Sequence, residues 1–168
     1  MKWLLSDLAV DNNQKMFYQE EFQPDIKDFE TIKRLKAIDS FNINGYWYYD
    51  DISDHLYTEF NLSGNIVIAD SITLENIDYH IDVDSKEVFG FDQLDDVSDY
   101  LVKGDSIDLS PIINQIIVAS IPFKFTSEET VYPKGESWEV ITEADFNKEP
   151  KAVNPQMAKL LEIDIEGE

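Results

Sequence analysis

The sequence has no cysteine among its 168 residues, which excludes a disulfide framework and any metal site built from thiolates. It also has little of the chemistry that phosphate binding or catalysis requires, with a single arginine, Arg34, and two histidines. Arginine is the preferred bidentate ligand of phosphate and guanine, so its scarcity disfavours an extensive grip on nucleic acid. No glycine-rich phosphate loop is present, and no serine stands in a nucleophile elbow.

Long apolar runs are missing as well. The first residues, Met-Lys-Trp-Leu-Leu-Ser-Asp, lack the apolar stretch of a signal peptide. No segment approaches the length that a membrane span requires. We therefore expect a cytoplasmic protein with no membrane partner.

The most pronounced feature that is present is negative charge. Lysine and arginine together number 13, against 35 aspartates and glutamates, so the formal net charge is −22. A field of this sign repels phosphate backbones and anionic lipids and attracts basic proteins. The alternative is that the acidity only keeps the protein in solution.

The carboxylates are too frequent for their pairing in sequence to indicate a catalytic site. A metal-dependent nuclease needs carboxylates that converge on a metal beside groups that hold phosphate, and basic residues are scarce here. The segment from Asp82 to Lys86 begins like a calcium-binding loop. Lys86, however, stands at the third ligand position, and Glu87 replaces the required glycine.

The two histidines do not change this interpretation. His55 and His80 both fall on the polar side of predicted strands, which predicts two exposed imidazoles. The rings would be neighbours if these strands pair in register. The sequence thus predicts no catalytic residue, no metal ligand, no cofactor and no small-molecule substrate.

Residues 107–122 are the densest aliphatic stretch and predict the main helix, at about residues 110–121. Ser110 is suited to cap the helix, Pro111 fits its first turn, and Pro122 ends it. A buried strand is the alternative, because isoleucine and valine favour sheets. An apolar stripe at helical spacing supports the helix; it consists of Leu109, Ile112, Ile113, Ile116, Ile117 and Ile121.

Alternating apolar and polar residues predict antiparallel strands with one wet face. The predicted strands cover residues 14–22, 37–49, 55–69, 77–83 and 138–141, with an acidic loop at 92–104. In the strand at 55–69, Gly64 indicates a bulge or a close approach of two backbones. The predicted fold class is α+β: a twisted or barrel-like antiparallel sheet packed by the helix at about 110–121.

The C-terminal region carries a weaker pattern. Asn154 and Pro155 predict the start of a short helix with Met157, Leu160 and Leu161 on its apolar side. Beyond it, the chain ends in an acidic, frayed segment. We expect residues 1–168 to form one domain, with a mobile stretch at 126–156.

Two further clusters have both a structural and a functional interpretation. Lys33, Arg34 and Lys36 form a basic cluster on a short helix predicted at residues 28–36. They are either a solvated face or a small contact point for RNA. The aromatic run at residues 46–49 either contributes to the core and the sheet surface or stacks bases.

Residues 62–89, beginning Leu-Ser-Gly-Asn-Ile-Val-Ile-Ala-Asp and ending Glu-Val-Phe, resemble the YceD family. Three later motifs agree in order: Ile-Asp-Leu-Ser-Pro at 107–111, Ser-Ile-Pro at 120–122 and Asn-Pro-Gln-Met-Ala-Lys-Leu at 154–160. The Met-Lys-Trp start resembles the Gram-positive branch of this family. The resemblance covers nearly the whole chain.

The chain departs from the family pattern at several positions. Many members carry a Cys-x-x-Cys pair where this chain has Asp70 and Thr73, and further cysteines after the proline that matches Pro122. Four cysteines would suit zinc, so metal is not essential to this member. Two arginines of the pattern are Ile72 and Gln156 here, which makes direct RNA contact at those positions less expected.

The resemblance implies a non-enzymatic factor that supports accumulation or assembly of large-subunit (23S) ribosomal RNA. The charge adds the hypothesis that it binds a basic ribosomal or assembly protein, with ribosomal RNA involved only indirectly. The alternative is an acidic mimic of nucleic acid that inhibits a nucleic-acid-binding protein. The candidate partner- or RNA-binding residues are Lys33, Arg34, Lys36, Pro155 and Leu160.

Overall fold

The computed structural model describes residues 1–8, 14–91, 96–127 and 130–148. The chain divides into two units, residues 1–130 and 131–168, and each is described by itself. The elements are β1 (Lys2–Leu4), α1 (Leu5–Leu8), β2 (Met16–Phe22), the 3-10 helix η1 (Ile26–Phe29), β3 (Leu35–Asp50), β4 (His55–Ala69), β5 (Asn76–Gly90), β6 (Tyr100–Leu101), β7 (Ser106–Asp108), α2 (Ser110–Ser120) and α3 (Glu143–Lys148).

The first unit is built on a five-stranded sheet with the order β2-β3-β4-β5-β6. Neighbouring strands from β2 to β5 are antiparallel, and β6 is parallel to β5. β1 and β7 form a separate antiparallel pair. The α+β class is confirmed, with little helix. The barrel-like alternative is wrong, because the sheet ends at β2 and β6 and these strands do not pair with each other.

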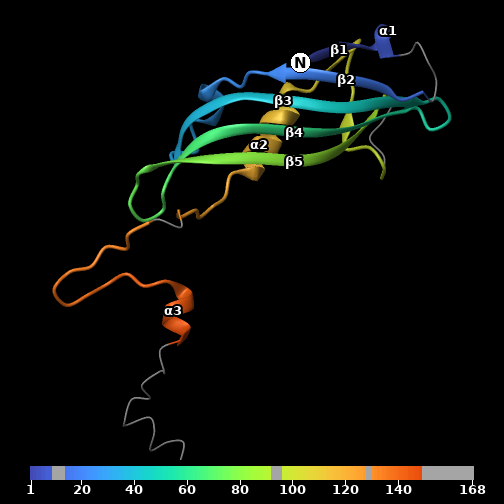
Figure 1. Ribbon diagram of the computed structural model, residues 1–168. Helices are drawn as coiled ribbons and strands as arrows, with labels where there is room; N and C mark the ends of the chain where they lie inside the picture. The colour runs from blue at the N-terminus through green and yellow to red at the C-terminus, as the bar shows by residue number, and fades with distance from the viewer. Residues whose placement is uncertain (9–13, 92–95, 128–129, 149–168) are drawn as a thin grey trace, which may run out of the picture. The chain divides into compact units, whose positions relative to one another are not determined.

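One face of the sheet is apolar, and α2 lies against it (Figure 1). The predicted alternation in β4 is confirmed, since every second residue from Leu56 to Ile68 is buried. Gly64 pairs with Phe41 of β3, and a Cβ at Gly64 would lie 2.6 Å from the Phe41 ring. The close approach expected at Gly64 therefore gives the fully buried Phe41 its place in the core.

The main helix is also confirmed, with a different cap. Ile112, Ile113 and Ile117 are buried against the sheet. Ser110 is the first helical residue rather than the N-cap. The Asp108 carboxylate accepts the backbone N–H of Ser110 at 2.9 Å, and this bond is the main reason why the pKa of Asp108 is lowered. At the other end, the chain turns extended before Pro122, as the proline predicts.

Three local predictions are wrong. Residues 28–36 form no α-helix: η1 ends at Phe29, a turn follows, and β3 begins at Leu35. Burial of Phe29 and Leu35 in the core accounts for the apolar spacing that suggested a helix. In place of a strand at 138–141, there is one isolated bridge between Lys134 and Glu139. The acidic loop after β5 contains the short strand β6.

The remaining predictions stay open. The predicted helix after Asn154 and the acidic end lie outside the described residues. The single domain over residues 1–168 and the mobile stretch at 126–156 stay predictions. Among the described residues, none of the helices has the length and apolar character needed to cross a membrane.

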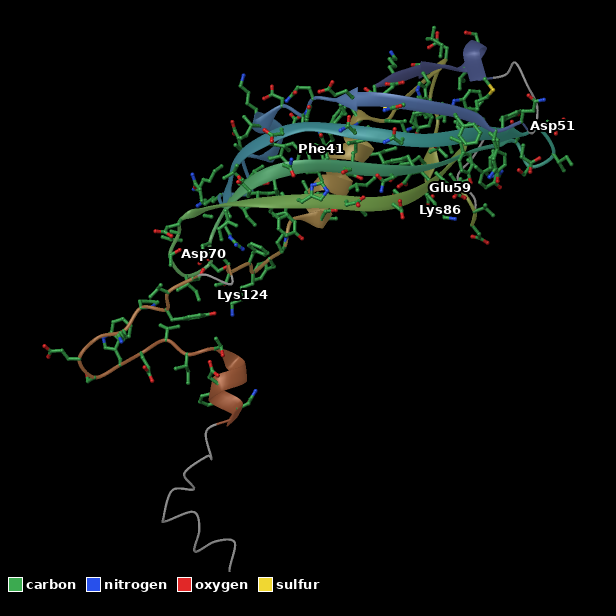
Figure 2. The ribbon with its side chains drawn as sticks, in the orientation of Figure 1. Phe41, Asp51, Glu59, Asp70, Lys86 and Lys124 are labelled. Atoms are coloured by element: carbon green, nitrogen blue, oxygen red, sulfur yellow. The ribbon has the colours of Figure 1, made fainter. Side chains whose placement is uncertain are left out.

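The turn between β4 and β5 is held by the carboxylate of Asp70 (Figure 2), which is only 1% exposed. It accepts the N–H groups of Ile72 and Thr73 in its own turn. It also accepts the N–H of Ser127 at 3.1 Å and the hydroxyl of Thr130 at 2.7 Å. Desolvation alone would raise the pKa of Asp70, but these hydrogen bonds outweigh it and lower the pKa well below its usual range.

The second unit is described from residue 131 to residue 148. Gly135 N–H donates to the carbonyl of Trp138 at 2.7 Å, which closes a tight turn beside the isolated bridge. Thr142 then caps α3, since its Oγ1 accepts the N–H of Asp145 at 3.0 Å. Several apolar side chains of the second unit are exposed, among them Val131, Trp138 and Phe146.

We predict that Ile117→Ala lowers the free energy of unfolding by about 2–5 kcal/mol, because it leaves a cavity where α2 packs on the sheet. The control is Val118→Ala on the exposed side of the same helix, which should change stability by less than about 0.5 kcal/mol. Urea unfolding followed by circular dichroism measures both. Equal losses in the two variants would contradict this packing.

We predict that Asp70→Ala lowers the midpoint of thermal unfolding, because it leaves buried donors without their acceptor. The control, Asp39→Ala, removes an exposed carboxylate of β3 and should lower the midpoint less. The pKa of Asp70 is lowered in the folded state, so its stabilisation is complete above the pKa of the unfolded chain, about 3.9, and is lost as the pH falls. Melting curves at neutral pH and at about pH 3 should therefore show the difference between Asp70→Ala and the wild type shrinking in acid.

Candidate partner-binding face

The sheet has a second face, on the side opposite α2, which we call the open face. It consists of the outward side chains of β2, β3, β4 and β5. The strand register arranges them in rows across the sheet, for example Tyr46, Glu59 and Lys86, and next to it Asn44, Asn61 and Asp84. Because the side-chain period of a strand is two, the apolar residues that fix the covered face also fix which residues lie in these rows.

Aromatic rings occupy the part of the open face nearest the β3–β4 turn. The rings of Tyr48 and Tyr57 stack directly across β3 and β4, with centroids 4.9 Å apart and planes 9° apart. Tyr46 continues the stack on β3, at 6.5 Å from Tyr48. Phe17 of β2 adds a fourth ring, 5.8 Å from Tyr46, and is 79% exposed. Tyr46, Tyr48 and Tyr57 thus form a stacked row on the surface, and Phe17 is tilted by 60° against Tyr46 at its end.

Two lysines of the chain itself bind to this part of the face. The ammonium of Lys15 lies 3.8 Å from the centroid of the Tyr46 ring. The pKa of Lys15 is raised, first by its hydrogen bond with Tyr46. The ammonium of Lys86 lies 3.1 Å from Oε1 of Glu59 (Figure 2), and this contact is the first reason why the pKa of Glu59 is lowered. The open face therefore accepts ammonium groups in two ways, over a ring and on a carboxylate.

Amides and carboxylates occupy the part of the open face towards the β4–β5 turn. The side-chain amide of Asn61 donates to Asp82 at 2.7 Å and to Asp84 at 3.1 Å. One amide thus holds two exposed carboxylates of β5 next to each other. Further along, His80 Nδ1 lies 2.8 Å from the Asn65 side-chain oxygen. The bonds from Asn61 thus orient the carboxylates of Asp82 and Asp84 on the surface.

A shallow hollow of about 430 Å³ joins the aromatic and polar parts. At this place β3 and β4 approach each other closely, since a Cβ on Gly45 would lie 2.4 Å from the carbonyl oxygen of Glu59. The glycine therefore allows the sheet to coil beneath the hollow. Among the residues that line it are Asn44, Tyr46, Glu59, Asn61, Asp84 and Lys86.

In the predicted basic cluster, Lys33 and Lys36 are exposed and Arg34 is engaged with the backbone. Arg34 is half-buried, and its guanidinium donates to the backbone carbonyls of Ala69, at 2.9 Å, and of Pro122 and Phe123. It joins the end of β4 to the segment after α2. Lys36 is exposed, and its ammonium donates to the carbonyl of Lys33 at 3.3 Å. The other candidate residues, Pro155 and Leu160, lie outside the described residues.

The prediction for the histidines is half wrong. His80 is exposed, as expected, but His55 is only 6% exposed; it pairs with Gly90 at the start of β4. The rings are not neighbours, since His80 pairs with Asn65. Within the described part of the chain, no three histidine or carboxylate side chains are arranged to hold a metal ion. Asp70 and Thr73 also lack the donor set of a four-thiolate zinc site.

Sequence reasoning did not single out the residues that make the open face distinctive. Tyr48, Tyr57, Asn61, Asp82 and Asp84 fall on the polar parity of three strands. The signal that could have found them is the register, because it brings Tyr48 to Tyr57 and Asn61 to Asp84. The sequence shows the aromatic run at residues 46–49 as one segment, and only the register adds the partner ring of Tyr57 on β4.

The described residues of the first unit define an α+β fold, in which α2 packs on one face of a five-stranded sheet and polar and aromatic side chains occupy the other face. The chain belongs to the YceD family: the family model described as "Large ribosomal RNA subunit accumulation protein YceD" matches residues 58–163. The resemblance seen in the sequence is thereby confirmed. "Uncharacterized protein YlbN" of Bacillus subtilis (strain 168) is similar, with 28% identity over 99% of this chain and 100% of its own length. No solved structure matches.

We predict that the double variant Asp82→Asn with Asp84→Asn folds and melts at the wild-type temperature or above it. The two carboxylates lie on the solvent side, and their mutual repulsion is relieved when both become amides. Thermal melts at low and high salt check this, since any gain should shrink as salt screens the repulsion. A large loss of stability would show that these carboxylates hold the fold instead.

Proposed function

We propose that this protein supports the accumulation of large-subunit ribosomal RNA in the cytoplasm by binding a basic ribosomal or assembly protein, and that it catalyses no reaction. The family description names accumulation of the large ribosomal RNA subunit and no catalytic activity. The observation that carries the partner is the open face, which combines fixed carboxylates with stacked rings on a chain of net charge −22. A cationic protein surface complements both.

Direct binding of RNA to this face is disfavoured by its charges. Proteins that hold single-stranded nucleic acid combine stacking rings with a positively charged groove along the backbone. Here the rings stand beside Glu59, Asp82 and Asp84. The lysines at this place, Lys15 and Lys86, are already engaged with Tyr46 and Glu59. The rings alone could stack a base, but the surrounding carboxylates would repel its phosphates.

The mixture of side chains also favours a protein partner over mimicry of nucleic acid. A mimic requires carboxylates spaced like phosphates along one ridge. The outward residues of β5 are not uniformly acidic, since His80 stands between Asp78 and Asp82, and Lys86 follows Asp84. Asparagines, serine and tyrosines fill the neighbouring strands. This pattern suits a partner that offers both positive charge and hydrogen-bonding groups.

We predict that the full chain binds at least one purified large-subunit ribosomal protein of its host, and that raising salt from about 50 to about 300 mM weakens binding by about tenfold or more, because exposed ion pairs are screened. Isothermal titration calorimetry with a panel of these proteins measures this. Protein-free large-subunit RNA is the parallel ligand.

Binding of the protein-free RNA, together with no binding of any basic ribosomal protein, would reject the proposal. A cellular readout accompanies the binding data. Depletion of the protein from its host should lower the amount of large-subunit RNA relative to small-subunit RNA. An unchanged ratio would contradict the role in accumulation itself.

A further inference from the structure

We propose that the open face is the docking site for an extended, arginine-containing segment of the partner, with arginines on the Tyr48–Tyr57 stack and on the Asp82–Asp84 pair. This inference deepens the proposed function and rests on it. It commits to a protein ligand of stated chemistry and to named residues. Charge complementarity and the positions of the chain's own lysines carry it.

The chain's own lysines show which ligand chemistry the face accepts. Lys15 places its ammonium over Tyr46, and Lys86 places its ammonium on Glu59. These contacts occupy one ring and one carboxylate. The adjacent ring pair, Tyr48 and Tyr57, and the adjacent carboxylates, Asp82 and Asp84, repeat the same chemistry one or two rows away. A partner's cations can bind there without displacing either lysine.

Arginine matches these two places better than lysine does. A guanidinium is planar and stacks on an aromatic face, and it meets carboxylates through two parallel hydrogen bonds. The Asn61 amide donates to Oδ1 of Asp82 and to Oδ1 of Asp84, which orients both carboxylates and leaves the second oxygen of each for a partner's guanidinium. A lysine offers a compact, strongly hydrated charge and would gain less from either place.

The spacing of the two places sets the length of the segment. Tyr57 lies in the row of Tyr48, and Ser63 lies in the row of Asp82. The six steps from residue 57 to residue 63 span about 20 Å at about 3.4 Å per residue. An extended peptide of about six or seven residues covers the same distance. The hollow between Tyr46 and Asn61 lies along this path and leaves room for the intervening side chains.

The test uses the full chain and a synthetic nine-residue peptide in which arginine alternates with serine. Matched peptides carry lysine, or neutral citrulline, in place of arginine, and a uridine octamer is the nucleic-acid probe. Fluorescence anisotropy at low salt measures affinity. We expect the arginine peptide to bind several-fold more tightly than the lysine peptide, and the citrulline peptide and the octamer to bind far more weakly.

Two variants of the face are compared with a control of equal charge. Asp82→Asn with Asp84→Asn, and separately Tyr48→Thr with Tyr57→Thr, should each weaken binding of the arginine peptide by about tenfold. The control, Glu30→Gln with Asp105→Asn, changes the charge by the same two units at exposed positions away from the open face. It should keep nearly wild-type affinity. The tyrosine variant changes no charge, so its loss of affinity cannot come from the net field.

Equal losses in the acidic variant and its control would overturn the inference, because net charge alone would then explain binding. Unchanged affinity in both face variants would overturn it too, as would tight binding of the octamer in place of the peptide. Failure of the site and failure of the function are separable. If a ribosomal protein binds the wild type and both face variants equally, the docking site is wrong and the proposed function stands. If the peptide binds the face but no ribosomal protein does, the site stands and the proposed function fails.

Discussion

The structure depends on the burial of one apolar sheet face beneath a single helix. Ile113 and Ile117 of α2 are fully buried against residues of β3 and β4, among them Phe41 and Leu62. Among the described residues of the first unit, α2 covers this face together with Phe29 of η1 and Ile107 of β7. Because strand residues alternate, the residues between the buried ones must face water. The polar and aromatic character of the open face is thus a direct consequence of how the core is closed.

A second set of bonds ties the sheet to the chain that follows α2. Arg34 donates to backbone carbonyls on both sides, and Asp70 accepts donors from its own turn and from Ser127 and Thr130. The buried carboxylate of Asp70 thus joins the β4–β5 turn to the segment after Pro122, and both of its oxygens accept hydrogen bonds. The hydrogen bonds of this one carboxylate therefore connect the β4–β5 turn to Ser127 and Thr130.

Much of this arrangement could be predicted from the sequence because it depends on local periodicity. The alternation in β4 and the stripe in α2 each follow from a single segment, and both predictions are confirmed. The predictions were wrong where contacts between segments far apart in the sequence determine the local structure. Residues 28–36 have helical spacing, but Phe29 and Leu35 reach the core from a turn and a strand instead. His55 has the parity of an exposed residue, and it is buried at the end of its strand.

The open face was harder to find for the same physical reason. Tyr48 and Tyr57 are separated by a turn, and only the register of β3 with β4 stacks them. Asn61 meets Asp82 and Asp84 only because β4 and β5 pair as they do. Neither arrangement lies within a single segment. The composition therefore predicts only the net charge of −22 and not where the charged groups lie. Net charge alone would attract a basic partner to any part of a uniformly acidic surface. A row of stacked rings beside a hydrogen-bonded pair of carboxylates distinguishes one place on that surface. Specificity requires such a distinction, because net charge accelerates encounters without selecting a pose.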